Sequence, residues 1–544
     1  MLNKLTIKGN IVDVIGRRIY KGIVYIENEI IVKIEEKEVE EDIFIMPGFI
    51  NSHVHIESSM LTPASFAEIA VKHGTVAVVS DPHEIANVCG NNGINFMLQS
   101  GKKTPLKFFF GAPSCVPATS FETSGHILSS KDIDNLLKRD DIYFLSEMMN
   151  FPGVIYKDSE VLKKIEFAHK YKKKIDGHAP GLSGNDLKKY ADAGISTDHE
   201  CITIEEAVEK IKFGIKIQIR EGSAAKNFES LYQLIDLYPD MIMLCTDDSH
   251  PDDLLNGHIN LLVKRALNKN LDLFNVLRSV SYNVVSHYNI DVGLLQTGDK
   301  ADFIIVDNLK SLNIEKTFIN GNIVYDGKST TFTNKETTII NNFNCNKINE
   351  SDIKIENAGE KIKVINIIDG ELFTQSFIYS HKQTDKYISS NINDDILKIV
   401  VVNRYKPSKP IIGFIKNFGL TKGAIAGSIA HDSHNIIVVG TSDSEMVIAV
   451  NKIIEIKGGI VVCNNDQTDF LELEIAGLMT NKNIYRVAKK YELLDFKAKT
   501  LGTKLKAPFM TLSFMALLVI PELKIGDKGL FDGNKFELTS LFTK

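Results

Sequence analysis

The sequence predicts an α/β protein: a TIM-like (β/α)8 barrel, a small β-sandwich formed by the segments that flank it, and a C-terminal α/β domain. In the middle of the chain, eight short apolar runs alternate with helix-like stretches, which is typical of a parallel sheet. β-rich segments lie on both sides of this region, and the composition changes after about residue 335. We therefore expect a sandwich of residues 1–46 and 290–335, a barrel of residues 47–289 and a C-terminal domain of residues 336–544.

The small sandwich is predicted from strand-like segments near the start of the chain and after the barrel. Residues 5–12 and 22–26 are rich in β-forming residues with Gly and Asn between them. The same pattern returns at residues 301–306 and 321–325. Alternating or clustered β-formers bounded by turn residues indicate strands, so both flanks should contribute to one small β unit.

The barrel is predicted from the eight apolar runs, of which the fifth and sixth are short. Helical stretches lie between them, for example at residues 65–72 and 158–171. Eight β/α units in about 250 residues match a TIM barrel, and the segments that follow its strands share the rim where barrel enzymes place their chemistry. The runs are residues 44–50, 75–79, 107–110, 143–145, 174–175, 194–196, 216–219 and 241–245.

The C-terminal part is predicted to be a second α/β unit that follows a polar, Asn-rich linker with edge strands at residues 334–349. Strands are expected at residues 362–366, 399–402 and 435–439, and a helix at residues 443–455. This combination of strands and a helix of ordinary length indicates a globular domain.

The composition limits the classes of partner and the cell compartment. The 544 residues include 44% apolar and 24% charged residues, with a net charge of −6, so no electrostatic feature favours nucleic acid or an anionic membrane. We see no signal peptide, and the apolar run at 509–520 is too short to span a bilayer. We therefore expect a cytoplasmic protein, and its size and apolar C-terminal segments predict a homo-oligomer. Six scattered cysteines without a CxxC pair are expected to be reduced thiols, namely Cys89, Cys115, Cys201, Cys245, Cys345 and Cys463.

Histidines and carboxylates gather at the predicted ends of the barrel strands. His53 and His55 are two residues apart, so both imidazoles can face one ion, although an isolated His-x-His is as often two ordinary histidines. Imidazole and carboxylate groups converging on one rim suit two divalent ions of the Mn, Fe or Zn type. The further members of the set are Glu147, His178, His199 and Asp247, which follow the fourth, fifth, sixth and eighth runs.

Several longer strings extend this pattern. They are NSHVHIESSM at residues 51–60, DPHEIANV at 81–88 and AHDSHN at 430–435. On these residues the chain resembles the amidohydrolase superfamily of metal-dependent hydrolases, and within it the bacterial adenine deaminases, over nearly its whole length. The resemblance implies that His53, His55, Glu147, His178, His199 and Asp247 are metal ligands, with Glu147 bridging the ions where many relatives use a carboxylated lysine.

The resemblance also implies a reaction. Two divalent ions, Mn²⁺ or Fe²⁺ with Zn²⁺ as the alternative, would hold a hydroxide that attacks C6 of adenine and releases hypoxanthine and ammonia. Asp247 would shuttle the proton. An alternative for Asp247 is a helix N-cap before Pro251, a position that Asp248 or Ser249 would fit as well.

Residues near the ligands are candidates for substrate binding. Dihydroorotase-like relatives have an Arg that grips a carboxylate two residues after the second His, whereas this chain has Glu57, which favours an uncharged purine. Glu84 or His83 is expected to contact ring nitrogens, with a strand-to-helix turn that places Glu84 near a helix start as the alternative.

Arg220 and Ser114 are further candidates. Arg220 would orient the base or form a salt bridge with Glu221 or Glu147. Ser114, next to Cys115, would line the pocket or simply form a turn of small residues.

The C-terminal domain contributes its own candidates. By the resemblance, His431, Asp432 and His434 would approach or close the active site. A loop turn, in which Asp432 bonds the backbone, explains them about as well.

Two other functions stay open. One is a hydrolase of the same superfamily that acts on a cyclic amide or another aminated heterocycle. The other is an inactive, scaffold-type relative, which the complete ligand set disfavours.

Overall fold

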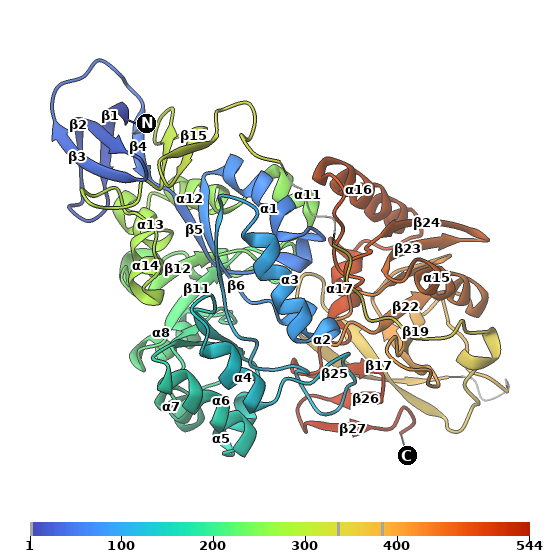
Figure 1. Cartoon of the computed structure of the whole chain (residues 1–544). Helices are drawn as coiled ribbons and strands as arrows, with labels where there is room; N and C mark the ends of the chain where they lie inside the picture. Colours follow the sequence, from blue (N-terminus) through green and yellow to red (C-terminus); the bar gives the residue numbers. More distant parts are fainter. Residues whose placement is uncertain (1–3, 334–337, 382–385, 544) are drawn as a thin grey trace.

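The computed structural model describes residues 4–333, 338–381 and 386–543. Figure 1 shows a small sheet at one end, strands surrounded by helices in the middle, and the C-terminal part packed beside them. The expected linker at 334–349 has no strand between residues 338 and 349, and its first four residues lie outside the described residues.

The small sheet is built from both flanks of the middle region, as predicted. β4 pairs with β14 in antiparallel fashion and with β1 in parallel fashion. The described strands form one hydrogen-bonded sheet in the order β16-β15-β14-β4-β1-β2-β3, where a small β-sandwich was expected. This sheet bends back on itself, because Ile30 forms a bridge with Lys300. The strands are β1 (Lys4–Asp13), β2 (Arg18–Glu27), β3 (Ile30–Glu36), β4 (Phe44–Pro47), β14 (Phe303–Val306), β15 (Ile314–Ile319) and β16 (Asn322–Tyr325).

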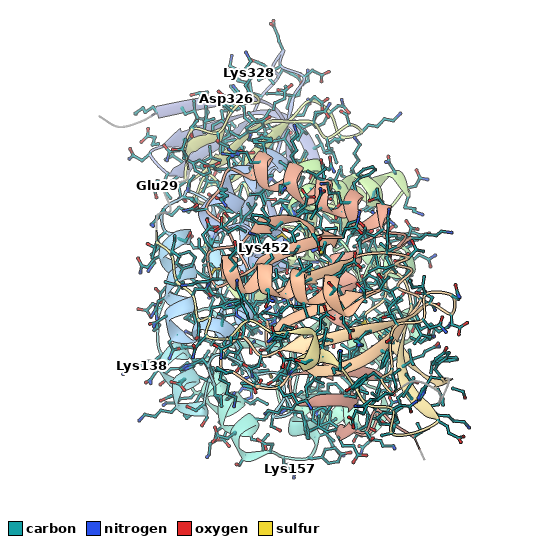
Figure 2. All side chains as sticks on the ribbon, turned by 90° about the vertical axis from the view of Figure 1, so that its right-hand side faces the viewer. Glu29, Lys138, Lys157, Asp326, Lys328 and Lys452 are labelled. Carbon is teal, nitrogen blue, oxygen red and sulfur yellow. The ribbon has the colours of Figure 1, made fainter. Side chains whose placement is uncertain are left out.

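The meeting of the two flanks is visible from the side. Figure 2 places Glu29, from the turn between β2 and β3, at the same end of the molecule as Asp326 and Lys328, which follow β16. Residues almost 300 positions apart in the sequence therefore lie at one end of the molecule.

The middle region contains parallel strands in sequence order. Over the described residues they form three hydrogen-bonded groups, β13-β5-β6-β7, β8-β9 and β10-β11-β12. Isolated bridges from Ala112 to Leu145 and from Ile175 to Ile195 connect neighbouring groups. β13 directly follows β12 in the sequence and pairs with β5, the first strand of this region. The last strand is therefore a neighbour of the first, as in a TIM-barrel-like fold. The strands are β5 (Phe49–His55), β6 (Thr75–Ser80), β7 (Lys107–Phe110), β8 (Phe144–Met148), β9 (Lys174–Gly177), β10 (Thr197–Asp198), β11 (Lys216–Arg220), β12 (Ile242–Cys245) and β13 (Asp247–Asp248).

Two of the eight expected runs differ from the observed strands. The run at 44–50 is divided at Gly48 into β4 and β5. A Cβ at Gly48 would lie 2.2 Å from Cγ1 of Val76, so only glycine permits this close approach. The sixth run, expected at 194–196, is observed as β10 (Thr197–Asp198), after the bridge at Ile195.

Amphipathic helices follow the strands, and several of them, including α1, α4, α6, α8 and α13, begin at a side-chain N-cap. In α6, Asp158 accepts hydrogen bonds from the N–H groups of Glu160 and Val161, while Val161, Ile165 and Ala168 are buried at helical spacing. The helices of this region are η1 (Ile56–Ser59), α1 (Pro63–Ala70), η2 (Val71–His73), α2 (His83–Cys89), α3 (Asn91–Gly101), α4 (Ser130–Leu137), α5 (Phe151–Ile155), α6 (Ser159–Lys170), α7 (Gly184–Asp192), α8 (Ile204–Lys212), α9 (Phe228–Leu231), α10 (Leu234–Leu237), α11 (Pro251–Asn256), α12 (Ile259–Asn268), α13 (Leu273–Ser279) and α14 (Tyr282–Tyr288).

The C-terminal part has a sheet in the order β18-β17-β20-β19-β22-β21-β23-β24 among its described residues. The expected strands and the helix are observed as β17, β19, β22 and α15. The elements are η3 (Glu350–Ile353), β17 (Lys361–Ile367), β18 (Thr374–Ser380), β19 (Ile396–Val402), β20 (Ile411–Lys416), β21 (Ala424–Gly427), β22 (Ile436–Gly440), α15 (Asp443–Ile456), β23 (Gly459–Asn464), β24 (Gln467–Glu472), α16 (Ile484–Thr500), α17 (Pro508–Phe514), β25 (Leu523–Gly526), β26 (Gly529–Asp532) and β27 (Glu537–Thr539).

One apolar core extends across the middle region and the C-terminal part. Ile85 and Phe144 of the first belong to the same buried cluster as Leu397, Leu478 and Phe509 of the second. The two parts are therefore held together by the hydrophobic effect. The apolar run at 509–520 is buried, as expected, and no helix among the described residues is long and apolar enough to cross a membrane.

Candidate active site

The two histidines of β5 face the same point, as the two-residue spacing predicts. Their Nε2 atoms lie 3.1 Å apart, and both side chains are buried. Nδ1 of His55 lies 3.1 Å from the carbonyl oxygen of Asp81 and donates a hydrogen bond to it. This leaves the lone pair of Nε2 free for a metal ion, the arrangement found at metal-binding histidines.

Glu147, at the end of β8, lies between two sets of histidines. Its Oε1 atom is 3.1 Å from Nε2 of His55. Its Oε2 atom is 2.9 Å from Nδ1 of His178 and 3.3 Å from Nε2 of His199. One carboxylate therefore faces imidazoles at the ends of three different strands, the position that a bridging ligand needs.

Asp247 completes this group from β13. Its Oδ1 atom lies 3.2 Å from Nε2 of His55 and 3.4 Å from Nε2 of His53. The φ angle of 53° at Asp247 is in the left-handed region, which costs a non-glycine residue of order 1–3 kcal/mol. The strained backbone aims this carboxylate at the histidines, so the expected N-cap role is not its main contact.

The group is suited to divalent cations. Ligand-type atoms of His53, His199 and Asp247 lie within 4.8 Å of one another, and so do those of Glu147, His178 and His199. Nδ1 of His53 and His199 and Nε2 of His178 have no hydrogen-bond partner among the described residues. Buried imidazoles beside carboxylates form the donor set of Mn, Fe and Zn sites.

The electrostatics agree with this reading. Burial raises the pKa of Asp247, but Arg220 and the adjacent histidines outweigh burial and hold it well below its usual value. Burial likewise opposes ionisation of Glu147, yet hydrogen bonds from His178, His199 and His55 lower its pKa well below the usual range. Both carboxylates are therefore anionic at neutral pH, as cation ligands must be.

Arg220, at the end of β11, is paired with two carboxylates. Its Nη2 atom donates to Oε2 of Glu200 at 2.9 Å, and its Nη1 atom donates to Oδ2 of Asp247 at 2.7 Å and also to Glu200. The expected salt bridge with Glu221 or Glu147 is wrong, because Glu200 occupies that position. Sequence reasoning missed Glu200, although a buried arginine next to a metal site requires a nearby carboxylate.

His83 and Glu84 begin α2, so the helix start that was the alternative interpretation of this segment is present, and the contact with ring nitrogens stays a prediction. Nδ1 of His83 lies 3.2 Å from Oδ2 of Asp81 and 3.4 Å from Oε1 of Glu147. Oε1 of Glu84 accepts a hydrogen bond from Ser58 at 2.9 Å. His83 thus borders the ligand group, whereas Glu84 lies one layer further out.

Glu57 and Ser114 are turned towards the backbone. Oε1 of Glu57 accepts the N–H of Ile85 at 3.2 Å, and burial beside Glu84 raises the pKa of Glu57 to about 8. The hydroxyl of Ser114 donates to the carbonyl oxygen of Glu147 at 2.6 Å. Neither residue lines the cavity over the ligand group, so a direct substrate contact for them stays a prediction.

The C-terminal part brings His431 and Asp432 to the site. Oδ1 of Asp432 lies 3.5 Å from Nε2 of His83, and Nδ1 of His431 lies 3.8 Å from Oε1 of Glu84. His434 is also buried but does not line the cavity, and its carbonyl oxygen accepts a hydrogen bond from Arg404 at 3.3 Å.

A small cavity, of about 30 Å³, lies over the ligand group. Its charged side includes Asp248, which the sequence suggested only as a helix cap. The other charged or imidazole residues that line it are His55, His83, Glu147, His178, His199, Glu200, Arg220, Asp247, His431 and Asp432. Its other side is apolar, and residues far along the sequence contribute most of that side. The apolar lining residues are Met149, Leu372, Phe514 and Leu517.

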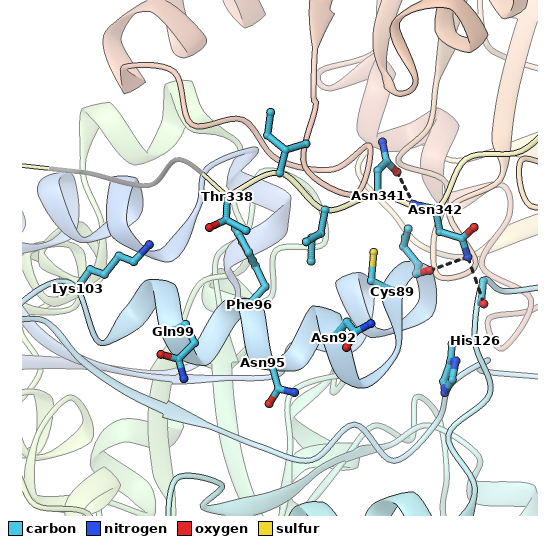
Figure 3. A pocket seen from close by; sticks show the side chains of 14 residues that line it. Cys89, Asn92, Asn95, Phe96, Gln99, Lys103, His126, Thr338, Asn341 and Asn342 are labelled. Atoms are coloured by element: carbon cyan, nitrogen blue, oxygen red, sulfur yellow. Dashed lines mark hydrogen bonds between the residues drawn. The ribbon is translucent and has the colours of Figure 1, made fainter.

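A larger cavity, of about 750 Å³, lies elsewhere, between α3 and residues 338–342 (Figure 3). Amide side chains line much of it, and Asn342 donates hydrogen bonds to the carbonyl oxygens of Val88 and Gly125. Among the described residues that line it there is no carboxylate and one histidine, His126. We therefore place the chemistry in the smaller cavity.

Comparisons with known proteins agree with this geometry. Residues 44–324 match the amidohydrolase family, and residues 371–537 match the adenine deaminase C-terminal domain. The adenine deaminase of Methanosarcina barkeri is 55% identical over 99% of both chains. That of Borreliella burgdorferi is 52% identical over 97% of this chain and 98% of its own, and that of Salinibacter ruber is 47% identical over 99% of both.

The chain therefore belongs to the amidohydrolase family, whose members bind divalent metal ions in a TIM-barrel-like domain. Within that family it belongs with the adenine deaminases, whose C-terminal domain it also carries. Among solved structures, a dihydropyrimidinase from Brevibacillus agri is 12% identical with a TM-score of 0.47, covering 60% of this chain and 96% of its own. That likeness is too distant to add to the assignment.

Proposed function

We propose that this chain hydrolyses adenine to hypoxanthine and ammonia. The observation that carries the proposal is the position of Glu147, whose two oxygens face His55 on one side and His178 and His199 on the other. A bridging carboxylate between two sets of imidazoles is what a pair of ions requires. The full-length similarity to adenine deaminases supports adenine as the substrate.

The proposed metal ligands are the six residues expected from the sequence. Their buried, anionic carboxylates and their converging imidazole nitrogens support two ions, with Mn²⁺ or Fe²⁺ preferred and Zn²⁺ as the alternative. When bound, the ions would lower the pKa of water enough to provide a nucleophile at neutral pH. The set is His53, His55, Glu147, His178, His199 and Asp247.

Asp247 is the proposed proton shuttle. Its Oδ1 atom faces the histidines, while its Oδ2 atom is held by Arg220. This contact fixes the carboxylate and keeps it ionised, so it can take a proton from water and pass it to ring N1 or to the departing amino group. Arg220 therefore acts here by holding Asp247, in addition to lining the cavity.

His83 is the proposed contact to a ring nitrogen, because it lines the cavity and its Nε2 atom points towards Asp432. Glu84 supports the residues on this side of the cavity indirectly. It accepts a hydrogen bond from Ser58 and lies close to His431. His431 and Asp432 would close the site from the C-terminal domain, which is the role expected from the sequence.

An uncharged base suits the cavity better than a carboxylate substrate. Glu57 replaces the arginine of the dihydroorotase-like relatives, and Arg220 is already paired with Glu200 and Asp247. No other lysine or arginine lines the cavity within the described part of the chain. A cyclic-amide substrate remains the alternative function.

A substrate screen tests the proposal. Protein that has been depleted of metal and reloaded with Mn²⁺ or Fe²⁺ should release ammonia from adenine. Glu147→Gln, which keeps the shape but weakens the bridge, should retain less metal and lose activity. Turnover of a dihydropyrimidine without turnover of adenine would instead favour the cyclic-amide alternative.

Three further expectations stay predictions: the domain bounds, a homo-oligomeric state and a cytoplasmic location. Sedimentation or light scattering of the purified chain would measure the oligomeric state directly.

A further inference from the structure

The cavity has two chemically opposite sides. One side is the group of imidazoles, carboxylates and Arg220, and the other side is formed by Leu372, Phe514 and Leu517 of the C-terminal part. We call these three residues the apolar wall. Phe514 ends α17 and is 2% exposed. It is the only aromatic hydrocarbon ring among the described residues that line the cavity.

A buried lysine holds the backbone of this wall. Lys524 of β25 is completely buried, and its Nζ atom donates to the carbonyl oxygen of Leu372 at 2.6 Å and to that of Phe514 at 3.0 Å. No carboxylate of the described chain forms an ion pair with it. Burial lowers the pKa of Lys524 to about 7, which shows that this position is costly for a charged amino group. Its two acceptors both belong to the apolar wall.

A second connection joins the wall to the polar residues of the same domain. The N–H of His431 donates to the carbonyl oxygen of Ser513 at 3.2 Å. The ring centroids of His431 and Phe514 lie 5.2 Å apart. The backbone of Phe514 is therefore held by Lys524, and its ring contacts His431.

We propose that the apolar wall is the face against which a flat, uncharged heteroaromatic base lies, with Phe514 as its main ring contact and Lys524 as the residue that positions it. This inference rests on the proposed function, because it places the base between the wall and the metal ligands. An aromatic side chain offers a favourable contact to any base. The three wall residues themselves offer no counter-charge to a charged substrate, which would lose hydration where it contacts them. The wall therefore selects for a neutral ring.

The test compares two identical substitutions at buried phenylalanines of the C-terminal domain. Phe514→Leu removes the ring from the cavity, and Phe414→Leu removes an equally buried ring of β20 that does not line it. In metal-loaded protein, Phe514→Leu should raise KM for adenine roughly tenfold, as expected for the loss of one base–aromatic contact, with a smaller change in kcat. Phe414→Leu should leave KM within a factor of two. A KM for Phe514→Leu within a factor of two of wild type would overturn the inference.

Lys524 is tested by a double-mutant cycle. Lys524→Met keeps the length of the side chain but removes both hydrogen bonds, and it should raise KM severalfold with unchanged metal content. Because Lys524 acts through Phe514, the double variant should raise KM no further than the larger single effect. If the increases in KM caused by the two single substitutions multiply in the double variant, the positioning role of Lys524 is refuted. If Lys524→Met does not fold, the Phe514 and Phe414 pair still decides the question of the ring contact.

The wild-type measurement separates this inference from the proposed function. Absence of adenine turnover by metal-loaded wild type would refute the proposed function. Calorimetric binding of adenine and hypoxanthine to wild type and Phe514→Leu would then still test the wall, since equal affinities of the two proteins would overturn it.

Discussion

Arg220 is the residue whose removal tests the electrostatics of the site most directly. It is 4% exposed and donates to both Glu200 and Asp247. Arg220→Met keeps most of the apolar stem but leaves two buried carboxylates without their cation. We expect this substitution to destabilise the fold strongly and to abolish most activity, because Asp247 loses the contact that orients it.

The magnitude follows from the geometry. At an effective dielectric constant near 20, two unit charges about 4 Å apart attract each other by about 4 kcal/mol. Removal of one partner from a buried ion pair costs about 3–5 kcal/mol. Arg265→Met is the matched control, since Arg265 also pairs with two carboxylates, Glu221 and Glu229, but is 36% exposed. Exposed pairs of this kind contribute about 0–1 kcal/mol.

The assay is urea unfolding followed by circular dichroism, because the chain has no tryptophan. It is run on protein with and without metal. Bound cations replace part of the missing positive charge, so the loss caused by Arg220→Met should be larger in chelated protein than in metal-loaded protein. The reasoning would be refuted if Arg220→Met cost no more than Arg265→Met in the absence of metal.

Three further predictions concern the ligands and the C-terminal domain. Asp247→Asn should keep the fold and lower the rate of ammonia release about 10²–10⁴-fold, the usual contribution of a general acid–base group; near-normal turnover would exclude the shuttle role. Chelation should lower both activity and the urea midpoint, and metal analysis after reloading should give two ions per wild-type chain and fewer for Glu147→Gln. Burial lowers the pKa of His431, but Glu84 and neighbouring carboxylates outweigh it and raise the pKa to about 9. Protonated His431 therefore stabilises the fold below about pH 6.5, and this stabilisation is lost as pH rises through about 9. Between pH 6 and 10 wild type should lose at most about 3 kcal/mol more than His431→Gln, and parallel curves would contradict the assignment.

The barrel strands could be predicted because buried parallel strands are continuous apolar runs. The exception is β10, where only Thr197 and Asp198 pair and no apolar run marks the position. The single bent sheet of the flanks could not be foreseen, since the bridge between Ile30 and Lys300 joins segments about 270 residues apart. Strand alternation predicts which residues face inward, but it does not predict how distant segments close on each other.

The residues of the candidate ligand group could be brought together from the sequence because strand ends share one rim. The partner of Arg220 was not found, although Glu200 directly follows His199. The apolar wall was beyond sequence reasoning for a different reason. The run at 509–520 was correctly expected to be buried, but only the packing of the C-terminal domain shows that Phe514 borders the cavity. Apolar runs alone do not distinguish a core residue from a lining residue.

The pairing of β4 with β14 has a consequence for how the chain matures on the ribosome. The strand at Phe44–Pro47 cannot form its pair with Phe303–Val306 until that later strand has been synthesised. At a synthesis rate of about 5–20 residues per second, this takes roughly 13–50 s. During that interval an edge of the first sheet is unpaired and open to contacts with other nascent chains. Translation speed and chaperone supply should therefore influence the yield of this protein more than that of a domain whose first sheet needs no strand from a distant part of the chain.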